Sequence, residues 1–189
     1  MKSKNYQRRH LRAPLRGSVL YADGDYVLKG TTLNISMGGL LIDQLPNFPE
    51  SDEVAILLSL PHFPILKNFS LLKMQTFSSD LFARRVIRAK ARMVRREQLS
   101  QNLDNIFRSR FGLEFIRITD IDEKHIEEYV TNYASNLVYL QTLIDSFNSD
   151  VDTKDRARAL AHILGYKNVE RIVDLHAAVS QDYKSLQWS

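Results

Sequence analysis

Two short segments of the chain combine residue types that can bind an anion. Near the N-terminus, Arg8-Arg9-His10-Leu11-Arg12 offers three guanidinium groups on a stretch with no apolar pattern. Farther along, Asn34-Ile35-Ser36-Met37-Gly38-Gly39 offers an amide, a hydroxyl and a glycine turn. A guanidinium group can bond a phosphate, or the O6/N7 edge of guanine, through two parallel hydrogen bonds, and it can stack on a base. Together the segments indicate a site for a small anionic ligand that carries guanine.

The backbone that must position the arginines is predicted to be extended. Ala13 precedes Pro14, and a proline ring disfavours helical geometry at the residue before it. In an extended chain Arg8 and Arg12 lie on the same side, about 13 Å apart at roughly 3.3 Å per residue. That separation is comparable to the span of a dinucleotide.

The second segment ends a predicted strand over Tyr26–Ser36. We assign Val27, Leu33 and Ile35 to its buried face. Thr32, Asn34 and Ser36 then share the other face. We therefore expect Asn34 and Ser36 to point outward together, with Gly38 and Gly39 turning the chain closely beneath a ligand.

In these residues the chain resembles the PilZ domain, whose signature is an RxxxR element followed by [D/N]xSxxG. The signature falls here on Arg8 and Arg12, and then on Asn34, Ser36 and Gly39. A later stretch, from Phe111 to Ile116, is similar to the last strand of such domains. The resemblance covers about residues 5–130, with a poorly matching stretch near 62–82.

The resemblance implies that the ligand is cyclic di-GMP, a bacterial second messenger. It implies contacts of Arg8 and Arg12 with guanine and phosphate, and contacts of Asn34 and Ser36 with a guanine. Gly39 would shape the turn, and Arg9 is a further candidate for ligand binding. Many members have a basic residue where this chain has Gln7, so the ligand is either one molecule or a stacked pair.

Composition narrows the classes of function. The 189-residue chain has no cysteine, which excludes disulfides, thiolate metal sites and cysteine nucleophiles. Its five histidines have no metal-ligand spacing, Ser36 lacks a nucleophile-elbow context, and no glycine pattern of a nucleotide-binding loop is present. We therefore expect a sensor without cofactor or metal, and not an enzyme. The longest apolar run, Val54 to Leu58, is too short to span a membrane, so a cytoplasmic location is expected.

The order of elements predicts strands first and helices afterwards. Strands are predicted over Leu15–Tyr21, Tyr26–Ser36, Leu40–Asp43, Glu53–Leu60, Val86–Arg95 and Phe107–Ile118. The predicted fold is mainly β with an α extension (α+β): a six-stranded antiparallel PilZ-like β-barrel followed by C-terminal helices. Residues 1–120 would form the barrel domain with its arginine arm, and residues 121–189 the helical extension. The stretch near 62–82 is predicted to leave the barrel and to pack part of its apolar content on it.

The helical part carries an apolar seam with heptad spacing. Its members are Ile126, Val130, Tyr133, Leu137, Leu140, Ile144 and Phe147. In one interpretation the seam packs against the barrel and the helices beyond it. In the other, helix 121–148 joins copies of the chain into a homo-oligomer. Thr153 and Asn168 are candidate N-caps of two later helices, the first ending at Gly165.

Charge is unevenly distributed and leaves a second interpretation open. The net charge is +4, and the basic residues concentrate in residues 1–100. A basic strand face with Arg88, Lys90, Arg92, Arg95 and Arg96 is a candidate surface for single-stranded nucleic acid. The face lacks interleaved aromatic residues and the helical part is acidic, so we expect no nucleic-acid partner. A third alternative is an adaptor that keeps the barrel and works through its helices without ligand. A protein partner is expected for the chain.

Overall fold

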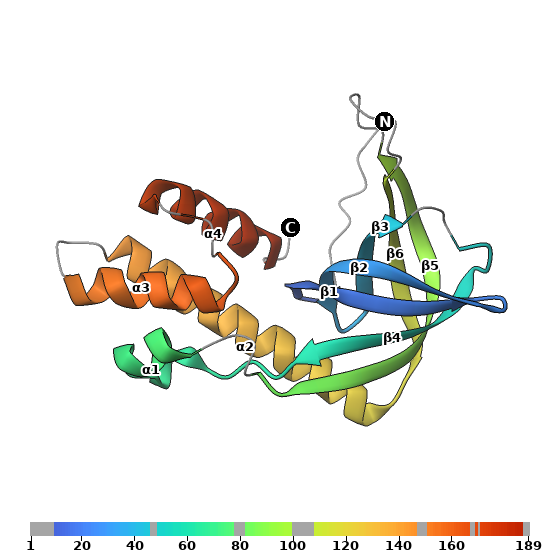
Figure 1. The fold of residues 1–189 in the computed structure, drawn as a ribbon, viewed down its shortest axis with the longest axis horizontal. Coiled ribbons are helices and arrows are strands. Elements are labelled where there is room, and N and C mark those ends of the chain that lie inside the picture. Colours follow the sequence, from blue (N-terminus) through green and yellow to red (C-terminus); the bar gives the residue numbers. More distant parts are fainter. Residues whose placement is uncertain are drawn as a thin grey trace.

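The computed structural model describes residues 10–45, 49–77, 82–99, 108–146, 151–166, 169 and 171–186. It shows a closed β-barrel beside a group of helices, linked by one long helix (Figure 1). The strands are β1 (Arg12–Asp23), β2 (Tyr26–Ser36), β3 (Gly39–Leu45), β4 (Glu53–Pro61), β5 (Arg84–Leu99) and β6 (Arg108–Ile118). The helices are the 3-10 helix η1 (Leu66–Asn68), α1 (Leu71–Thr76), α2 (Asp120–Asp145), α3 (Val151–Ile163) and α4 (Ile172–Leu186).

The predicted six-stranded antiparallel barrel is confirmed. Its strand order is β1-β2-β3-β6-β5-β4, and every neighbouring pair is antiparallel. The barrel closes where β1 meets β4, with Val19 opposite Leu58 and Ala22 opposite Ala55. Closure leaves no open sheet edge along these strands, which removes a template for aggregation.

Alternation along β5 places an apolar face inside the barrel. Ile87, Ala89 and Ala91 are buried, whereas the intervening Arg88 and Lys90 are exposed. The small alanines leave room for large side chains from other strands, and Tyr21 meets Phe111 edge to face at 5.8 Å between ring centroids. The two faces of β5 thus follow the alternation that the sequence predicts.

Helix α2 begins directly after β6. The Thr119 hydroxyl caps it by accepting the Asp122 N–H at 3.2 Å, and Asp120, Asp122 and Glu123 lie in the first turn, where the helix dipole favours negative charge. The Asp122 carboxylate also accepts the Arg88 N–H at 3.3 Å. The helix is thereby tied to β5 at the point where β6 ends.

The apolar seam of α2 is buried within the chain. Its described members are Ile126, Val130, Tyr133, Leu137, Leu140 and Ile144, and none is more than 5% exposed. The first half packs on the barrel and the second half on the other helices, as Figure 1 shows. This agrees with the first of the two interpretations of the seam. Oligomer formation through helix 121–148 stays a prediction, and Phe147 lies outside the described residues.

The stretch after β4 packs mainly on the helices rather than on the barrel. Asn136, which is fully buried in α2, accepts the Leu66 N–H and donates to the Pro64 carbonyl, both at 2.8 Å. Asn132 donates to the Phe63 carbonyl at 2.8 Å. These bonds satisfy backbone groups that pair with no strand, so two asparagines of α2 hold the excursion in place.

The ends of α3 agree only in part with the sequence prediction. Gly165, at a φ of +98°, follows the helix, and the Tyr166 N–H bonds back to the Ala161 carbonyl at 2.9 Å, which is a glycine-type helix end. Thr153 is wrong as an N-cap, because the helix already begins at Val151. Asn168, the other predicted cap, lies outside the described residues. The division into domains at residue 120 stays a prediction.

Candidate functional site

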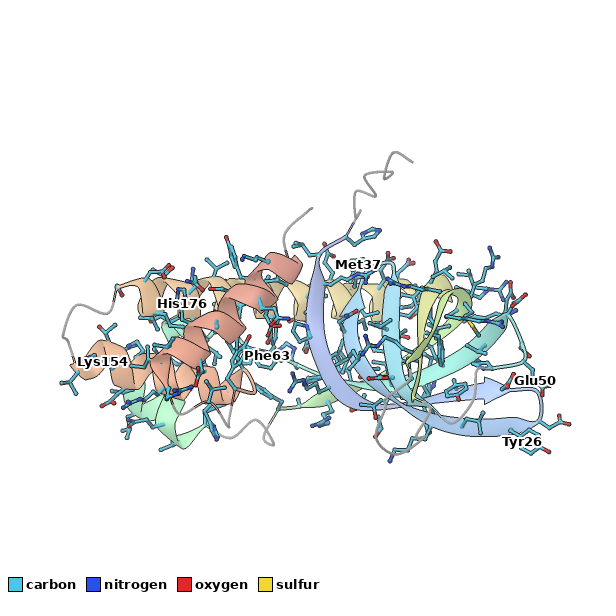
Figure 2. The ribbon with its side chains drawn as sticks, turned by 90° about the horizontal axis from the view of Figure 1, so that it is seen from above. Tyr26, Met37, Glu50, Phe63, Lys154 and His176 are labelled. Carbon is cyan, nitrogen blue, oxygen red and sulfur yellow. The ribbon has the colours of Figure 1, made fainter. Side chains whose placement is uncertain are left out.

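The motif residues that the structure describes meet where β1 begins and β2 ends. Arg12 stands directly opposite Ser36 in the antiparallel pair, and Pro14 stands opposite Asn34. Met37, labelled in Figure 2, marks the turn that follows. The structure therefore brings Arg12, Asn34 and Ser36 to one end of the barrel, whereas Arg8 and Arg9 lie outside the described residues.

The turn between β2 and β3 is held by hydrogen bonds on both of its sides. The Ser36 hydroxyl donates to the Gly39 carbonyl at 3.2 Å. The Phe115 N–H of β6 donates to the Gly38 carbonyl at 3.0 Å. The turn thus has a fixed position relative to β6 as well as to β1.

Glycine is required at position 39 by the packing of the turn on β6. Its φ is +154°, and a Cβ atom there would lie 1.9 Å from the Leu113 carbonyl oxygen. No heavy atoms approach so closely without a covalent bond, and the obstacle is backbone, so it cannot rotate away. The predicted role of Gly39, shaping a close turn, therefore has a direct steric cause.

His10 lies against the same turn. A Cβ atom added to Gly38 would approach the Cδ2 atom of the His10 ring to 3.0 Å. The missing side chain at Gly38 therefore makes room for the imidazole. This contact brings the described end of the N-terminal segment onto the glycine turn. The sequence prediction missed it, because a histidine between arginines gives no sign of a packing partner.

The expected orientation of β2 is wrong in part. Thr32 is 1% exposed and Ser36 is 5% exposed, whereas Val27 is 70% exposed. The register shifts between Thr32 and Asn34 in the pairing with β3, and such a bulge reverses the faces on its two sides. Both Asn34 and Ser36 lie after this bulge. They do not form one outward-facing pair, because Ser36 is buried within the turn.

The buried Thr32 is explained by the opposite strand. Its hydroxyl accepts the Gly17 N–H at 3.2 Å and donates to the Gly17 carbonyl at 3.0 Å. The β1–β2 pairing shifts register between Pro14 and Gly17, so the threonine side chain satisfies backbone groups at the irregularity. A polar residue inside the barrel is tolerated here because its hydrogen bonds are made.

Asn34 keeps its amide available. The side chain is half-buried, and within the described part of the chain it makes no hydrogen bond to protein. A primary amide offers two N–H donors and a carbonyl acceptor, which matches the mixed donor and acceptor edge of a guanine. Asn34 is thus a polar group at this end of the barrel whose side chain the described part of the protein leaves without a hydrogen bond.

A second contact ties the beginning of β1 to α2. The Tyr129 hydroxyl donates to the Pro14 carbonyl at 2.6 Å. Burial, with a smaller contribution from the neighbouring Tyr133, raises the pKa of the Tyr129 hydroxyl, so it stays a protonated donor at physiological pH. The sequence prediction missed Tyr129 because it lies beside the heptad seam rather than in it.

The basic face of β5 is partly neutralised by two acidic residues. One lies in the loop before β4, and the other is the first residue of β4. Glu53 pairs with Lys90 at 2.7 Å and with Arg92 at 3.4 Å, and Asp52 pairs with Arg96 at 3.2 Å. The hydrogen bond and charge of Lys90 lower the pKa of the Glu53 carboxyl, with a smaller effect of Arg92. A surface that binds a nucleic-acid backbone needs its cations for phosphates, so these pairs count against that use.

Among the described residues, no group of three or more histidine and acidic side chains is arranged to hold a metal ion. In the same ranges, no helix combines the length and the apolar character that crossing a membrane requires.

Comparisons with known proteins find a family for the part of the chain that includes this candidate site. The family model described as the PilZ domain matches residues 6–132. The chain is similar in structure to the Bacillus subtilis inhibitor of motility MotI/DgrA, with 14% identity, a TM-score of 0.45, and coverage of 66% of this chain and 49% of that one. It is also similar to the PilZ domain of Escherichia coli YcgR with c-di-GMP, with 14% identity, a TM-score of 0.43, and coverage of 66% of this chain and 88% of that one.

A third similar structure is that of Borreliella burgdorferi PlzA in complex with c-di-GMP, with 17% identity, a TM-score of 0.40, and coverage of 72% of this chain and 48% of that one. The chain thus spans about half the length of the Bacillus and Borreliella proteins. No curated protein sequence matches the chain.

Proposed function

Because the chain belongs to the PilZ domain family, as the match over residues 6–132 shows, we propose that it is a receptor for cyclic di-GMP and not an enzyme. The observation that carries the proposal is the antiparallel register that sets Arg12 opposite Ser36, beside the available amide of Asn34. The motif segments, far apart in the sequence, thereby form one end of the barrel.

Each group at this end has a chemical role in the proposal. Arg12 bonds a phosphate or the O6/N7 edge of guanine through its guanidinium group. Asn34 reads the donor and acceptor edge of a guanine with its amide. Ser36 and Gly39 act on the backbone, because the Ser36 hydroxyl is directed at the Gly39 carbonyl and holds the turn on which the ligand rests.

Arg8 and Arg9 complete the proposed site. They precede the described residues, and His10 leads toward the site through its contact with Gly38. In the proposal the arm closes over the ligand and adds two more guanidinium groups. Whether one ligand molecule or a stacked pair is bound follows from the stoichiometry of the titration described below.

The proposed output passes through α2. The Tyr129 bond to Pro14 joins this helix to β1 two residues after Arg12. Ligand that fixes the beginning of β1 thus favours one position of α2 over others. A protein partner would read that position at the barrel or the helices, in the cytoplasm.

Calorimetric titration with cyclic di-GMP tests the proposal. The wild-type chain should bind, and Arg12→Ala should weaken binding by about ten- to a hundredfold, the loss of one charge-assisted bidentate contact of about 1.5 to 3 kcal/mol. Arg8→Ala should have an effect of the same order. Arg16→Ala is the matched control, since Arg16 is an exposed arginine on the same strand and should leave affinity unchanged.

Two results would contradict the proposal. Equal affinity of the wild type and the Arg12→Ala variant would refute the site. Absence of ligand binding by the folded wild type would refute the receptor. In that second case, oligonucleotide binding that falls steeply with salt would favour the nucleic-acid module.

A further inference from the structure

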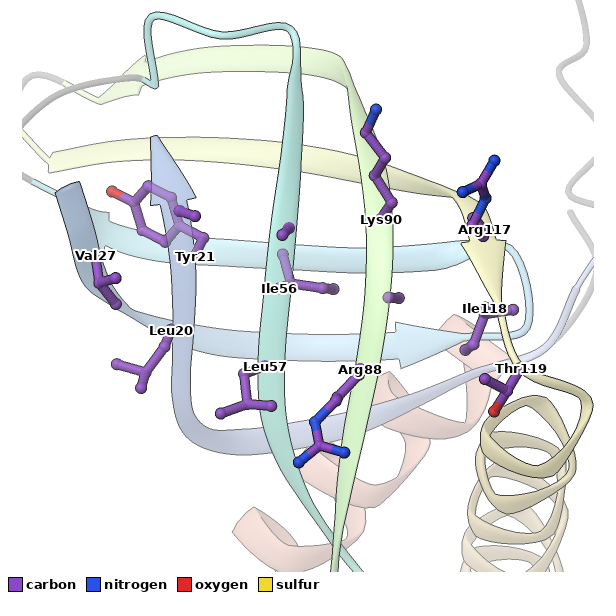
Figure 3. A pocket seen from close by; sticks show the side chains of 13 residues that line it. Leu20, Tyr21, Val27, Ile56, Leu57, Arg88, Lys90, Arg117, Ile118 and Thr119 are labelled. Atoms are coloured by element: carbon purple, nitrogen blue, oxygen red, sulfur yellow. The ribbon is translucent and has the colours of Figure 1, made fainter. Parts of the chain in front are cut away.

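The outer face of the barrel carries an open apolar groove of about 630 Å³ across β1, β4 and β5. Its floor is formed by Ala22 and Ala55, which pair across β1 and β4. Leu20 and Leu57, the next outward pair, form one wall (Figure 3). Val27 of β2, which is 70% exposed, forms another wall. We call these five residues the alanine trough.

The shape of the alanine trough suits an inserted side chain. Leu20 and Leu57 are both more than one third exposed, although equivalent outward positions of a barrel in water are usually polar. The two alanines at the floor leave a depression between larger neighbours. A contiguous apolar surface of this kind is typical of a contact site.

Cationic side chains edge the trough on the side of β5 and β6. Arg88 and Arg117 both line it, and Figure 3 shows Arg88 beside Leu57. Over the residues that the structure describes, neither guanidinium group makes a hydrogen bond or an ion pair. The occupant that fits the trough therefore combines an apolar side chain with negative charges.

The chain itself carries such a segment next to the trough. Thr119 lines the trough and is the N-cap of α2. In the first turn of α2, Asp120 and Glu123 are exposed, and Ile121 between them is 67% exposed. An exposed isoleucine flanked by two carboxylates is the chemical complement of an alanine floor flanked by two guanidinium groups.

We propose that the alanine trough is the interface of a symmetric dimer of this chain, in which the first turn of α2 of each copy occupies the trough of the other. A two-fold axis near Thr119 makes both contacts at once, because the trough and its complement adjoin in each copy. Ile121 lies on Ala22 and Ala55 of the second copy, and its two acidic neighbours face Arg88 and Arg117. The α2 seam takes no part, since it is buried within each chain.

Sedimentation velocity of the full chain, with Ala55→Glu, is the first test. The wild type should show a dimer whose dissociation constant rises with salt, since charge pairs at a surface are screened. Ala55 is exposed, so a glutamate there leaves the fold intact but puts a carboxylate under the incoming Ile121. The dissociation constant should rise by about thirtyfold or more. A wild type that stays monomeric overturns the proposal.

Charge reversal with mixing is the decisive test. The variant Arg88→Glu with Arg117→Glu, and the variant Asp120→Lys with Glu123→Lys, should each be monomeric because each carries like charges on both surfaces. Mixed together they should form a heterodimer, since each surface then meets its opposite. A mixture that stays monomeric, with both variants folded by circular dichroism, overturns the proposal.

Lys154→Glu with Lys184→Glu is the matched control. It changes the net charge by the same amount as the double arginine reversal but lies on the helices, and Figure 2 shows Lys154 at the end of the molecule away from the barrel. It should dimerise like the wild type. A dimer that is lost in this control, or that survives Ala55→Glu unchanged, places the interface elsewhere.

Discussion

The Tyr129 hydroxyl reaches from α2 to the Pro14 carbonyl at 2.6 Å, across 115 positions of sequence. Pro14 is opposite Asn34 in the β1–β2 pair. The helix and the candidate ligand site therefore share one strand. The Tyr129–Pro14 hydrogen bond is a direct contact between α2 and the part of β1 that carries Arg12. It is therefore the place to test whether the ligand site and α2 are coupled.

Tyr129→Phe removes that bond without removing the ring. We expect the free energy of unfolding to fall by about 1 kcal/mol, the net value of one hydrogen bond. Hydrogen exchange should show that cyclic di-GMP protects α2 in the wild type and does so less in the variant. Tyr139→Phe is the control on the same helix, and equal ligand-dependent protection of the wild type and Tyr129→Phe would exclude this path.

Gly39→Ala should strongly destabilise the barrel. The added Cβ would lie 1.9 Å from the Leu113 carbonyl oxygen, so β3 and β6 must separate, and a loss of more than about 4 kcal/mol is expected. Gly24→Ala is the control, because Gly24 also has a positive φ but an added Cβ there meets nothing within 4 Å. That variant should lose only about 1 kcal/mol. Denaturant titration measures both, and similar stabilities would contradict the steric argument.

Asn136→Ala should release the excursion after β4. The change leaves the Leu66 N–H and the Pro64 carbonyl without their partner, and each unsatisfied buried group costs about 1 to 3 kcal/mol. The Leu66 amide should then exchange with solvent much faster. Asn132→Ala removes only one bond, to Phe63, and should have a smaller effect. Unchanged exchange at Leu66 would show that other contacts hold the segment.

Asp23 should contribute to stability at neutral pH and less in acid. Hydrogen bonds from the Glu50 N–H, and then from the Ser51 N–H, lower the pKa of its carboxyl below 3.8. A lowered pKa stabilises the folded chain above the unfolded value of about 3.9, and this contribution is lost as pH falls from there through the folded pKa. Asp23→Asn should therefore show a shallower decline of unfolding free energy below pH 4, and an identical decline would contradict it.

The sequence predicts those parts of the fold in which each residue follows a simple repeat. The alternation of Ile87, Ala89 and Ala91 with basic residues gives β5 its faces, and heptad spacing gives α2 its seam. The sequence prediction fails where the repeat breaks. The bulge after Thr32 exchanges the faces of β2, and residue types alone do not indicate such a bulge.

The candidate site was predictable as a set of residues and not as a geometry. The motif pattern names Arg12, Asn34 and Ser36, and antiparallel pairing brings them together. The burial of Ser36 and the contact of His10 with Gly38 depend on a turn whose position is set by β6. Such contacts join segments far apart in the chain and leave no local pattern.

The length of helix α2 has a geometrical consequence for the proposed receptor. Its 26 residues span about 39 Å at 1.5 Å per residue. One end rests on the barrel, and α3 and α4 pack along the other (Figure 1). A tilt of about 5° at the barrel then displaces the far end by about 3 Å for a rod of this length. In the proposed receptor, the helix would act as a lever arm that amplifies a movement too small to rearrange the barrel.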